Sequence, residues 1–315
     1  MQPRLVCLGN LTVDDLYLPD GSTRPGCVGG DAFYAALGAR LWEPRTAMFA
    51  PVGADLPKAS HAAIERSGFD ASVLPRRKAS TIRNQVHYGA DGSRHWVYEF
   101  SPDAFQELSV MPADIPDWIL GAEAILISAM SLEAQEACVE FLRRRSQALL
   151  VLDLQEEYIP ANQQRILDIV ARVDMFLPSE EEARRLSGRE DWEYVAKMFA
   201  DVGPEIVAIK LAERGALLYD RSADSYVRAS ARQVAVVDPT GAGDGWCGGF
   251  VAGYLQDPTD LPRAARCGAI SAAFAVSGYG TDGLLNATTE AAARALDSRD
   301  GWLPAYSVGA TSQPA

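Results

Sequence analysis

The sequence alternates short apolar runs with longer amphipathic segments, and this order restricts the possible folds more than any other feature. Most runs precede a helix-like segment of roughly ten to fifteen residues. The runs lie at 5–9, 45–53, 124–128, 148–154, 175–179 and 205–211. Such an alternation is typical of βαβ units, in which helices connect parallel strands. It predicts an α/β fold whose central sheet is mostly parallel.

One segment, 81–100, departs from the alternation. It reads as two strands around an Asp91-Gly92 turn, a dipeptide that favours tight hairpins. The first strand would place Ile82, Val86 and Tyr88 on one side, interrupted by Asn84, and Arg83, Gln85 and His87 on the other. A hairpin has no crossover helix, so it cannot extend a parallel core in the usual way. We expect a small β-flap over the mouth of the sheet, with an antiparallel edge as the alternative.

Composition limits the partners of the chain. Its 315 residues include 29 Lys+Arg and 42 Asp+Glu, which gives a formal net charge of −13. This balance argues against nucleic acids and anionic membranes, because both require clustered cations. The five cysteines are scattered without a CxxC pair, which favours reduced thiols and a cytoplasmic location. No apolar run approaches the ~18 residues of a membrane-spanning helix, and the first residues lack the pattern of a signal peptide.

The most informative segment is 233–255, QVAVVDPTGAGDGWCGGFVAGYL. It predicts a strand at 234–237, a turn at 238–240 and a helix that begins at 241–244. Further glycines follow inside that helix, at Gly245, Gly248, Gly249 and Gly253. Each costs roughly 1 kcal/mol relative to alanine in a helix interior. Close packing or a ligand must therefore require these small residues.

The start of this helix has the properties of an anion hole. Its first N–H groups lack partners within the helix and carry partial positive charge, and glycines let a phosphate approach the backbone. Asp244 would serve there as a base that takes a proton from an attacking hydroxyl. Two alternatives remain: a dinucleotide-binding turn, since Gly243-x-Gly245-x-x-Gly248 has its spacing, and a helix start used only for packing. No GxxxxGK[ST] pattern occurs, which excludes a P-loop kinase.

The residues DPTGAGDGW (238–246) strongly resemble the C-terminal signature of the ribokinase-like, or PfkB, carbohydrate kinases. Weaker likenesses follow the family order along nearly the whole chain: GNLTVDD at 9–15, VGGDAFYAALGARL at 28–41, the flap at 81–100, PSEEEARRLSG at 178–188 and KLAERG at 210–215. The resemblance implies a three-layer αβα sandwich. It also implies a single core over 1–315, with a β-lid from about 11–27 and 80–102 and a loose tail at 304–315.

The resemblance implies roles for residues on the acceptor side. Asp244 would be the catalytic base. Its own amide would complete an anion hole formed by Gly241, Ala242 and Gly243. Asp14 would bind substrate hydroxyls, and Gly29 and Gly30 would let the substrate approach the backbone.

It implies a nucleotide and metal side as well. ATP would lie along Lys210, Leu211, Ala212, Glu213, Arg214, Gly215 and Gly243. Glu182 would help to organise Mg²⁺ through water. Asp238 and Thr240 match positions that contribute to a potassium site in many members.

Four positions depart from the family pattern. Tyr34 takes the place of the Asn that ends the diglycine motif, and Ser179 takes the place of the Asn in Asn-x-x-Glu. Trp246 and Cys247 stand where Phe and Asn are usual. The first departure leaves the substrate open. The second affects phosphate and metal handling, because a serine hydroxyl reaches less far than an amide.

Simpler explanations compete at several of these positions. Asp14 and Asp15 could be acidic residues of a solvated turn. Glu180, Glu181 and Glu182 could only stabilise a helix N-terminus through its dipole. Lys210 could be a surface lysine at the end of a strand.

We therefore expect an ATP-dependent kinase that phosphorylates a hydroxyl, in particular the hydroxymethyl group, of a small sugar. A nucleoside is the alternative acceptor. A weakly active ligand-binding or regulatory protein on the same scaffold is a further alternative, motivated by Tyr34 and Ser179. The expected cofactors are ATP, Mg²⁺ and K⁺. Relatives dimerise through the lid, and the sequence leaves the oligomeric state open.

Overall fold

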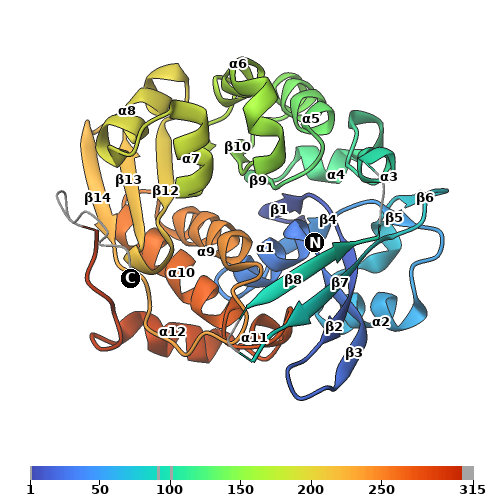
Figure 1. Cartoon of the computed structure of the whole chain (residues 1–315). Helices are drawn as coiled ribbons and strands as arrows, with labels where there is room; N and C mark the ends of the chain where they lie inside the picture. The colour runs from blue at the N-terminus through green and yellow to red at the C-terminus, as the bar shows by residue number, and fades with distance from the viewer. Residues whose placement is uncertain (1, 91–92, 100–101, 307–315) are drawn as a thin grey trace.

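The centre of the molecule is an eight-stranded sheet with helices on both faces (Figure 1). The computed structural model describes residues 2–90, 93–99 and 102–306. In sheet order the strands are β14 (Ser225–Ala229), β13 (Ala216–Asp220), β12 (Ile206–Lys210), β11 (Met175–Phe176), β10 (Leu149–Leu152), β9 (Ala124–Ile127), β1 (Leu5–Leu8) and β4 (Thr46–Phe49). Neighbouring strands from β12 to β4 are parallel, and β13 and β14 join antiparallel. The predicted α/β fold with a mostly parallel sheet is confirmed.

The sheet separates two apolar cores, because successive side chains of a strand point to opposite faces. In β1, Leu5 and Cys7 pack in one core, whereas Val6 and Leu8 pack in the other. All four side chains are fully buried. Strands buried on both faces read as continuous apolar runs, which is the pattern that the sequence shows here.

Helices cover the two faces in separate groups (Figure 1). The core that holds Leu5 is covered by α1 (Asp31–Arg40), α2 (Lys58–Arg66), α9 (Ala242–Gln256), α10 (Leu261–Ala275), α11 (Asp282–Leu285) and α12 (Thr289–Asp297). The core that holds Val6 is covered by α4 (Asp117–Leu120), α5 (Leu132–Arg145), α6 (Ile159–Val170), α7 (Glu180–Ser187) and α8 (Trp192–Val202). A further short helix, α3 (Pro102–Glu107), follows the hairpin region.

A second sheet of four strands lies beside the main one, at the lower right of Figure 1. Its order is β3 (Thr23–Gly29), β2 (Thr12–Tyr17), β7 (Ile82–Tyr88) and β8 (Arg94–Tyr98). The antiparallel pair β7–β8 is the expected hairpin, although its Asp91-Gly92 turn lies outside the described residues. We call these four strands the small sheet; they fall mostly within the ranges expected for a lid, whose role remains a prediction. A two-stranded pair, β5 (Val52–Gly53) and β6 (Arg76–Arg77), completes the strands of the described residues.

The strand predicted at 234–237 is wrong. This segment has no strand partner, and Val236 is 63% exposed. Its ends are tied by single backbone bonds, from the Gln233 amide to the Gly301 carbonyl and from the Val237 amide to the Val276 carbonyl. The valines favour an extended chain, but the segment pairs with neither edge strand of the main sheet, β14 or β4. It runs along the rim of a cavity instead.

The glycines of α9 allow two helices to approach it very closely. A Cβ on Gly248 would overlap the Ala35 carbonyl of α1. A Cβ on Gly249 would lie 2.8 Å from the Cys267 carbonyl oxygen of α10. Such contacts exclude any larger side chain, so packing explains Gly248 and Gly249.

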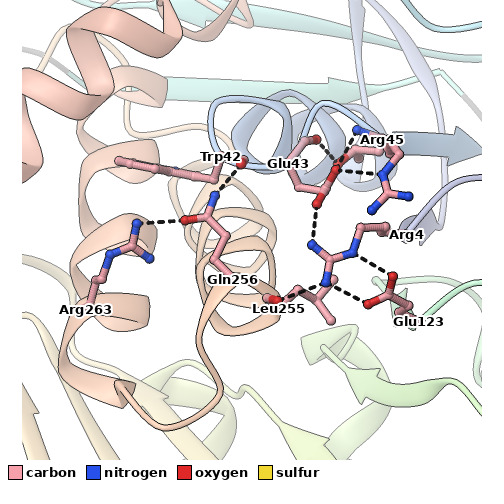
Figure 2. Close-up of polar contacts among 9 residues, drawn as sticks. Arg4, Trp42, Glu43, Arg45, Glu123, Leu255, Gln256 and Arg263 are labelled. Carbon is pink, nitrogen blue, oxygen red and sulfur yellow. Dashed lines mark hydrogen bonds and ion pairs between the residues drawn. The ribbon is translucent and has the colours of Figure 1, made fainter.

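A polar network joins the amino ends of the central strands to the far end of α9 (Figure 2). The Arg4 guanidinium donates to both carboxylate oxygens of Glu123, each at 2.7 Å, and to Glu43 Oε2 at 2.8 Å. It also donates to the Leu255 carbonyl at 3.0 Å. The Glu43 side chain is only 6% exposed, so Arg4 neutralises a nearly buried carboxylate at the side of the sheet away from the predicted site.

Candidate active site

The turn at 239–244 separates two cavities. The first, which we call the inner cavity, has a volume of about 550 Å³ and its walls include Asp14, Asn84, Thr240, Gly241 and Asp244. The second, the outer cavity, has a volume of about 470 Å³ and its walls include Val234, Val236, Pro239, Ala242 and Gly243. The two cavities therefore meet at the start of α9. A group passing from one to the other would pass the Gly241–Asp244 backbone.

Asp244 lies in the first turn of α9, behind a left-handed Gly241 with φ of 72°. Its place in the inner-cavity wall, shielded from bulk water, raises the pKa of its carboxyl well above the usual range. The carboxylates of Asp31 and Asp153 raise this pKa further, while Lys210 opposes them. A carboxyl whose pKa is raised above its usual range is a stronger base than an ordinary carboxylate and is suited to take a proton.

Asp14 lies inside β2, not in a solvated turn. It is 6% exposed, and its carboxylate accepts hydrogen bonds from Asn84 Nδ2 at 2.7 Å and from Thr12 Oγ1 at 3.0 Å. Burial raises the pKa of Asp14 to about 6, although these two bonds lower it. The strand thus presents an acceptor to the inner cavity.

Two amide oxygens of residues that line the inner cavity lack partners among the described residues. Asn10 donates to the Ala129 carbonyl at 3.0 Å and Asn84 donates to Asp14, yet Oδ1 of each is buried without a hydrogen bond. Buried acceptors without partners are costly. Because both residues line the inner cavity, a bound molecule rich in hydroxyl donors would satisfy them.

Lys210 carries a positive charge in the wall of the outer cavity. Its Nζ donates to Asp153 Oδ1 at 2.7 Å and to Cys247 Sγ at 3.2 Å. Burial opposes this charge, but Asp153, Cys247 and Glu182 outweigh it and hold the pKa of Lys210 well above its ordinary value. Nζ lies 3.7 Å from where a Cβ on Gly243 would stand. An ammonium group is therefore held beneath the predicted anion hole.

Comparison with known proteins matches this geometry to a family. The model described as pfkB family carbohydrate kinase matches residues 21–288. The chain belongs to the PfkB family. It is similar to the cytidine kinase of Thermococcus kodakarensis, with 32% identity over 256 residues that cover 80% of this chain and 88% of that enzyme.

Solved structures agree on the fold. A Vibrio cholerae O395 fructokinase bound to fructose, ADP and a calcium ion has a TM-score of 0.77 and 22% identity, and the match covers 94% of this chain and all of that chain (100%). An E. coli ribokinase II candidate in complex with ATP and Mg²⁺ has a TM-score of 0.76 and 19% identity, with 93% and 99% covered. The ribokinase-like fold is confirmed, and the chain is a PfkB phosphotransferase that acts on sugar-like substrates.

In this PfkB kinase, the residues predicted along the nucleotide divide into two sets. Those that line the outer cavity are Lys210, Ala212, Glu213, Gly215 and Gly243. Leu211 is instead fully buried in the core, and Arg214 forms an ion pair with Glu180. The outer cavity therefore gathers most, but not all, of the predicted set.

The predicted acceptor residues divide similarly. Asp14, Gly30 and Asp244 line the inner cavity. Gly29 does not; a Cβ there would overlap the Asp14 carboxylate, so its small size leaves room for that side chain. Gly30 has φ of 95°, and a Cβ on it would stand 2.6 Å from the Asn10 carbonyl oxygen. Its role is to let the chain turn tightly into α1.

Glu182 is engaged in capping its own helix. Its carboxylate accepts from the Ser179 amide at 2.7 Å, and Ser179 Oγ accepts from the Glu182 amide at 3.2 Å, which is a reciprocal capping box. Burial raises the pKa of Glu182 to about 7, with a further contribution from Asp153. Capping of its own helix thus accounts for these contacts of Glu182, and a metal role for it remains a prediction.

The side chains of Asp238 and Thr240 do not fit a potassium ion. Asp238 is fully buried, and Tyr88 Oη, the Gly280 amide and both the amide and hydroxyl of Thr240 donate to it. These four bonds use the acceptor capacity of a carboxylate. A cation would have to displace donors that the protein already provides.

Sequence reasoning missed Asp31 and Asp153. Asp31 is the first residue of α1, and its shielded position raises its pKa to about 7, with Asp153 and Glu157 contributing. Asp153 directly follows β10, and its carboxylate accepts a hydrogen bond from Lys210. The carboxyl ends of parallel strands form the usual ligand edge of such sheets. The polar residue after each predicted strand was therefore a usable signal.

The acidic groups near Lys210 suit a metal that arrives with the nucleotide. Within residues 2–90, 93–99 and 102–306, no three His, Cys, Asp or Glu side chains form a metal-binding group by themselves. In phosphoryl-transfer sites Mg²⁺ is usually held by one or two carboxylates together with phosphates and water. A contribution of Asp153 and Glu182, the two carboxylates that act on Lys210, remains a prediction. No helix of the described chain combines the length and apolarity needed to cross a membrane.

Proposed function

We propose that this chain transfers the γ-phosphoryl group of ATP to the hydroxymethyl group of a ribonucleoside. The observation that carries the proposal is the shared wall of two cavities at the Gly241–Asp244 turn. ATP would occupy the apolar outer cavity, and the acceptor would occupy the inner cavity. The γ-phosphoryl group would then lie against the backbone amides at the start of α9.

The walls of the inner cavity favour a nucleoside over a bare sugar. They include five aromatic side chains, namely Tyr34, Trp96, Tyr98, Phe105 and Tyr158. Aromatic rings are suited to stack on a planar base, and a volume of about 550 Å³ exceeds the needs of a single sugar ring. Similarity to a cytidine kinase supports the same choice. A sugar was the first expectation from the sequence; the proposal places a nucleoside first, and the aromatic lining of the cavity supports that choice.

Asp244 would act as general base. Its carboxylate takes the proton of the acceptor hydroxyl, whose oxygen forms a bond to the γ-phosphorus. The bond from that phosphorus to the β–γ bridging oxygen breaks, and ADP leaves with the bridging oxygen. The amides of Gly241 to Asp244 and the ammonium of Lys210 stabilise charge on the transferred group. Bound Mg²⁺, held with the help of Asp153 and Glu182, would supply further neutralisation of the phosphates.

A coupled assay of ADP release tests the proposal. Ribonucleosides, deoxyribonucleosides, free sugars and sugar phosphates would be compared as acceptors, each with ATP and Mg²⁺. The highest kcat/KM is expected with a ribonucleoside. A free sugar as the best acceptor would overturn the choice of substrate, and silence with every acceptor would favour a ligand-binding protein on the kinase scaffold.

A further inference from the structure

The small sheet holds the turn that leads into the anion hole. Tyr88 Oη, from β7, donates to Asp238 Oδ2 at 2.6 Å. Arg94, from β8, donates to Thr240 Oγ1, and its Nη1 lies 3.6 Å from Asp238 Oδ1. Tyr88 and Arg94 face each other in the β7–β8 ladder. One cross-strand pair therefore contacts both polar residues of the turn.

Asp238 depends on these contacts because it has no access to water. The side chain is 0% exposed, and its remaining donors are the Gly280 amide at 2.9 Å and the amide and hydroxyl of Thr240 at 3.0 and 2.6 Å. These donors are neutral. Arg94 supplies positive charge from the small sheet, and a buried carboxylate that loses its charge partner is strongly destabilised.

We propose that Tyr88 and Arg94 are positioning residues that order the anion-hole turn from the small sheet, so that catalysis needs no monovalent cation at Asp238. The proposal rests on the proposed kinase function. In it, the Arg94 guanidinium supplies the positive charge that a bound K⁺ would otherwise bring. The turn then reaches its catalytic shape only when the small sheet lies over the inner cavity.

The same sheet carries Asp14 and Asn84, which line the inner cavity. Binding of the acceptor would draw the small sheet onto the cavity, and Tyr88 and Arg94 would then order residues 238–241. Acceptor binding and the anion hole become linked through one rigid element. ATP bound alone would face a less ordered turn, which limits transfer of its phosphoryl group to water.

Steady-state kinetics in two salts tests the proposal. The wild type, Tyr88→Phe and Arg94→Ala would be assayed in KCl and in tetramethylammonium chloride at equal ionic strength. The wild type is expected to have the same kcat in both salts. Both variants are expected to lose about tenfold or more in kcat, consistent with one lost bond to a buried group, with a smaller change in KM for ATP. Arg94→Ala should regain part of its kcat in KCl only.

The controls remove the same groups elsewhere in the small sheet. Tyr17→Phe removes a hydroxyl from a ring that stacks on His87, and Arg83→Gln removes a guanidinium from the opposite side of β7. Both should keep the wild-type kcat and its indifference to K⁺. Strong activation of the wild type by KCl, or wild-type kcat in Tyr88→Phe and Arg94→Ala, would overturn the proposal.

A second measurement separates this proposal from the proposed function. Amide hydrogen exchange at residues 240–245 can be compared in the wild type and Tyr88→Phe without any turnover. Faster exchange in the variant supports the positioning role even if no acceptor is phosphorylated. Equal exchange overturns it, whatever the kinase assay shows.

Discussion

The ring of Tyr34 lies directly against the backbone of Gly241, so that a Cβ atom on Gly241 would overlap the aromatic carbons. This contact gives a physical meaning to one departure from the family pattern. The Tyr34 ring supports the turn that precedes Asp244, and it also lines the inner cavity. A side-chain amide does lie beside Asp14, that of Asn84 in β7.

Gly241→Ala should damage both the turn and the activity. The residue has φ of 72°, a conformation that costs a non-glycine residue about 1 kcal/mol, and the added carbon would collide with Tyr34. We expect kcat to fall by about tenfold or more. Gly188→Ala is the matched control, because Gly188 has φ of 68° with nothing within 4 Å of a built Cβ. An equal effect of both variants on kcat would contradict the assigned role of the Tyr34 contact.

Asp244→Asn should remove turnover and stabilise the protein. Loss of a general base lowers kcat by about 10²–10⁴-fold, whereas ligand binding should persist. The free energy of unfolding should rise at pH 7.5, because the pKa of Asp244 is raised by its shielded position and by Asp31 and Asp153. Assays of ADP release and urea unfolding would measure both effects. Asp201→Asn, at an exposed position of α8, should change neither; near wild-type turnover in Asp244→Asn would refute the assignment of the base.

The affinity for the acceptor should depend on the ionisation of Asp14. Burial raises the pKa of Asp14 to about 6, so the carboxylate is lost as the pH falls below that value. KM for the acceptor should rise between pH 7 and pH 5, and Asp14→Asn should flatten the profile. The folded state also holds this proton in a range where the unfolded chain has released it, so the contribution of Asp14 to stability falls as the pH rises from about 4 to about 6. A KM that is constant over this range in the wild type would speak against Asp14 as a ligand.

Asn84→Ala should weaken binding of hydroxyl-rich acceptors in particular. The buried Oδ1 of Asn84 has no partner among the described residues, and a substrate hydroxyl that satisfies it should contribute on the order of 1 kcal/mol. KM for a ribonucleoside should rise about fivefold, with less change for the analogue that lacks the contacting hydroxyl. Gln85→Ala, which affects the other side of the same strand, is the control. Equal losses for ribonucleoside and deoxy analogues would argue against a direct contact.

Arg4→Ala should destabilise the fold without changing the site. The variant leaves Glu43, whose side chain is 6% exposed, without its close cation (Figure 2). We expect the free energy of unfolding to fall by about 1–3 kcal/mol. Arg45→Ala removes a longer, more exposed contact to the same carboxylate, 3.6 Å away, and should change stability by less than about 1 kcal/mol. Urea unfolding of both variants measures the difference.

The six parallel strands of the main sheet, β1, β4 and β9 to β12, could be predicted from the sequence because each is a local apolar signal. The two strands that join antiparallel, β13 and β14, were not predicted. A buried strand such as β9 needs only a few consecutive apolar residues between turns. The 234–237 segment shows the limit of that signal, since its valines have the right propensity but no neighbouring strand edge to join. Pairing is decided by the rest of the chain, and local composition does not contain it.

In the site, too, local features could be predicted from the sequence, whereas contacts between distant residues could not. Asp244 could be predicted because its turn, its glycines and its helix are contiguous. Asp153 and Lys210 are 57 residues apart, and Tyr88 and Asp238 are 150 apart; their contacts arise only when separate elements meet at one edge of the sheet. Spacing along the chain carries no information about such pairs.

The close packing of α9 has a mechanical consequence. Backbone meets backbone at Gly248 and Ala35, and again at Gly249 and Cys267, so the helix that carries Asp244 can neither slide nor turn without a collision. The Asp244 carboxylate is thus held in a fixed place, and we expect that movement during the catalytic cycle is confined to the small sheet. A Gly248→Ala substitution would then displace the Asp244 carboxylate, although Gly248 lies more than a helical turn further along α9. The residues that contact the ligands would all be unchanged.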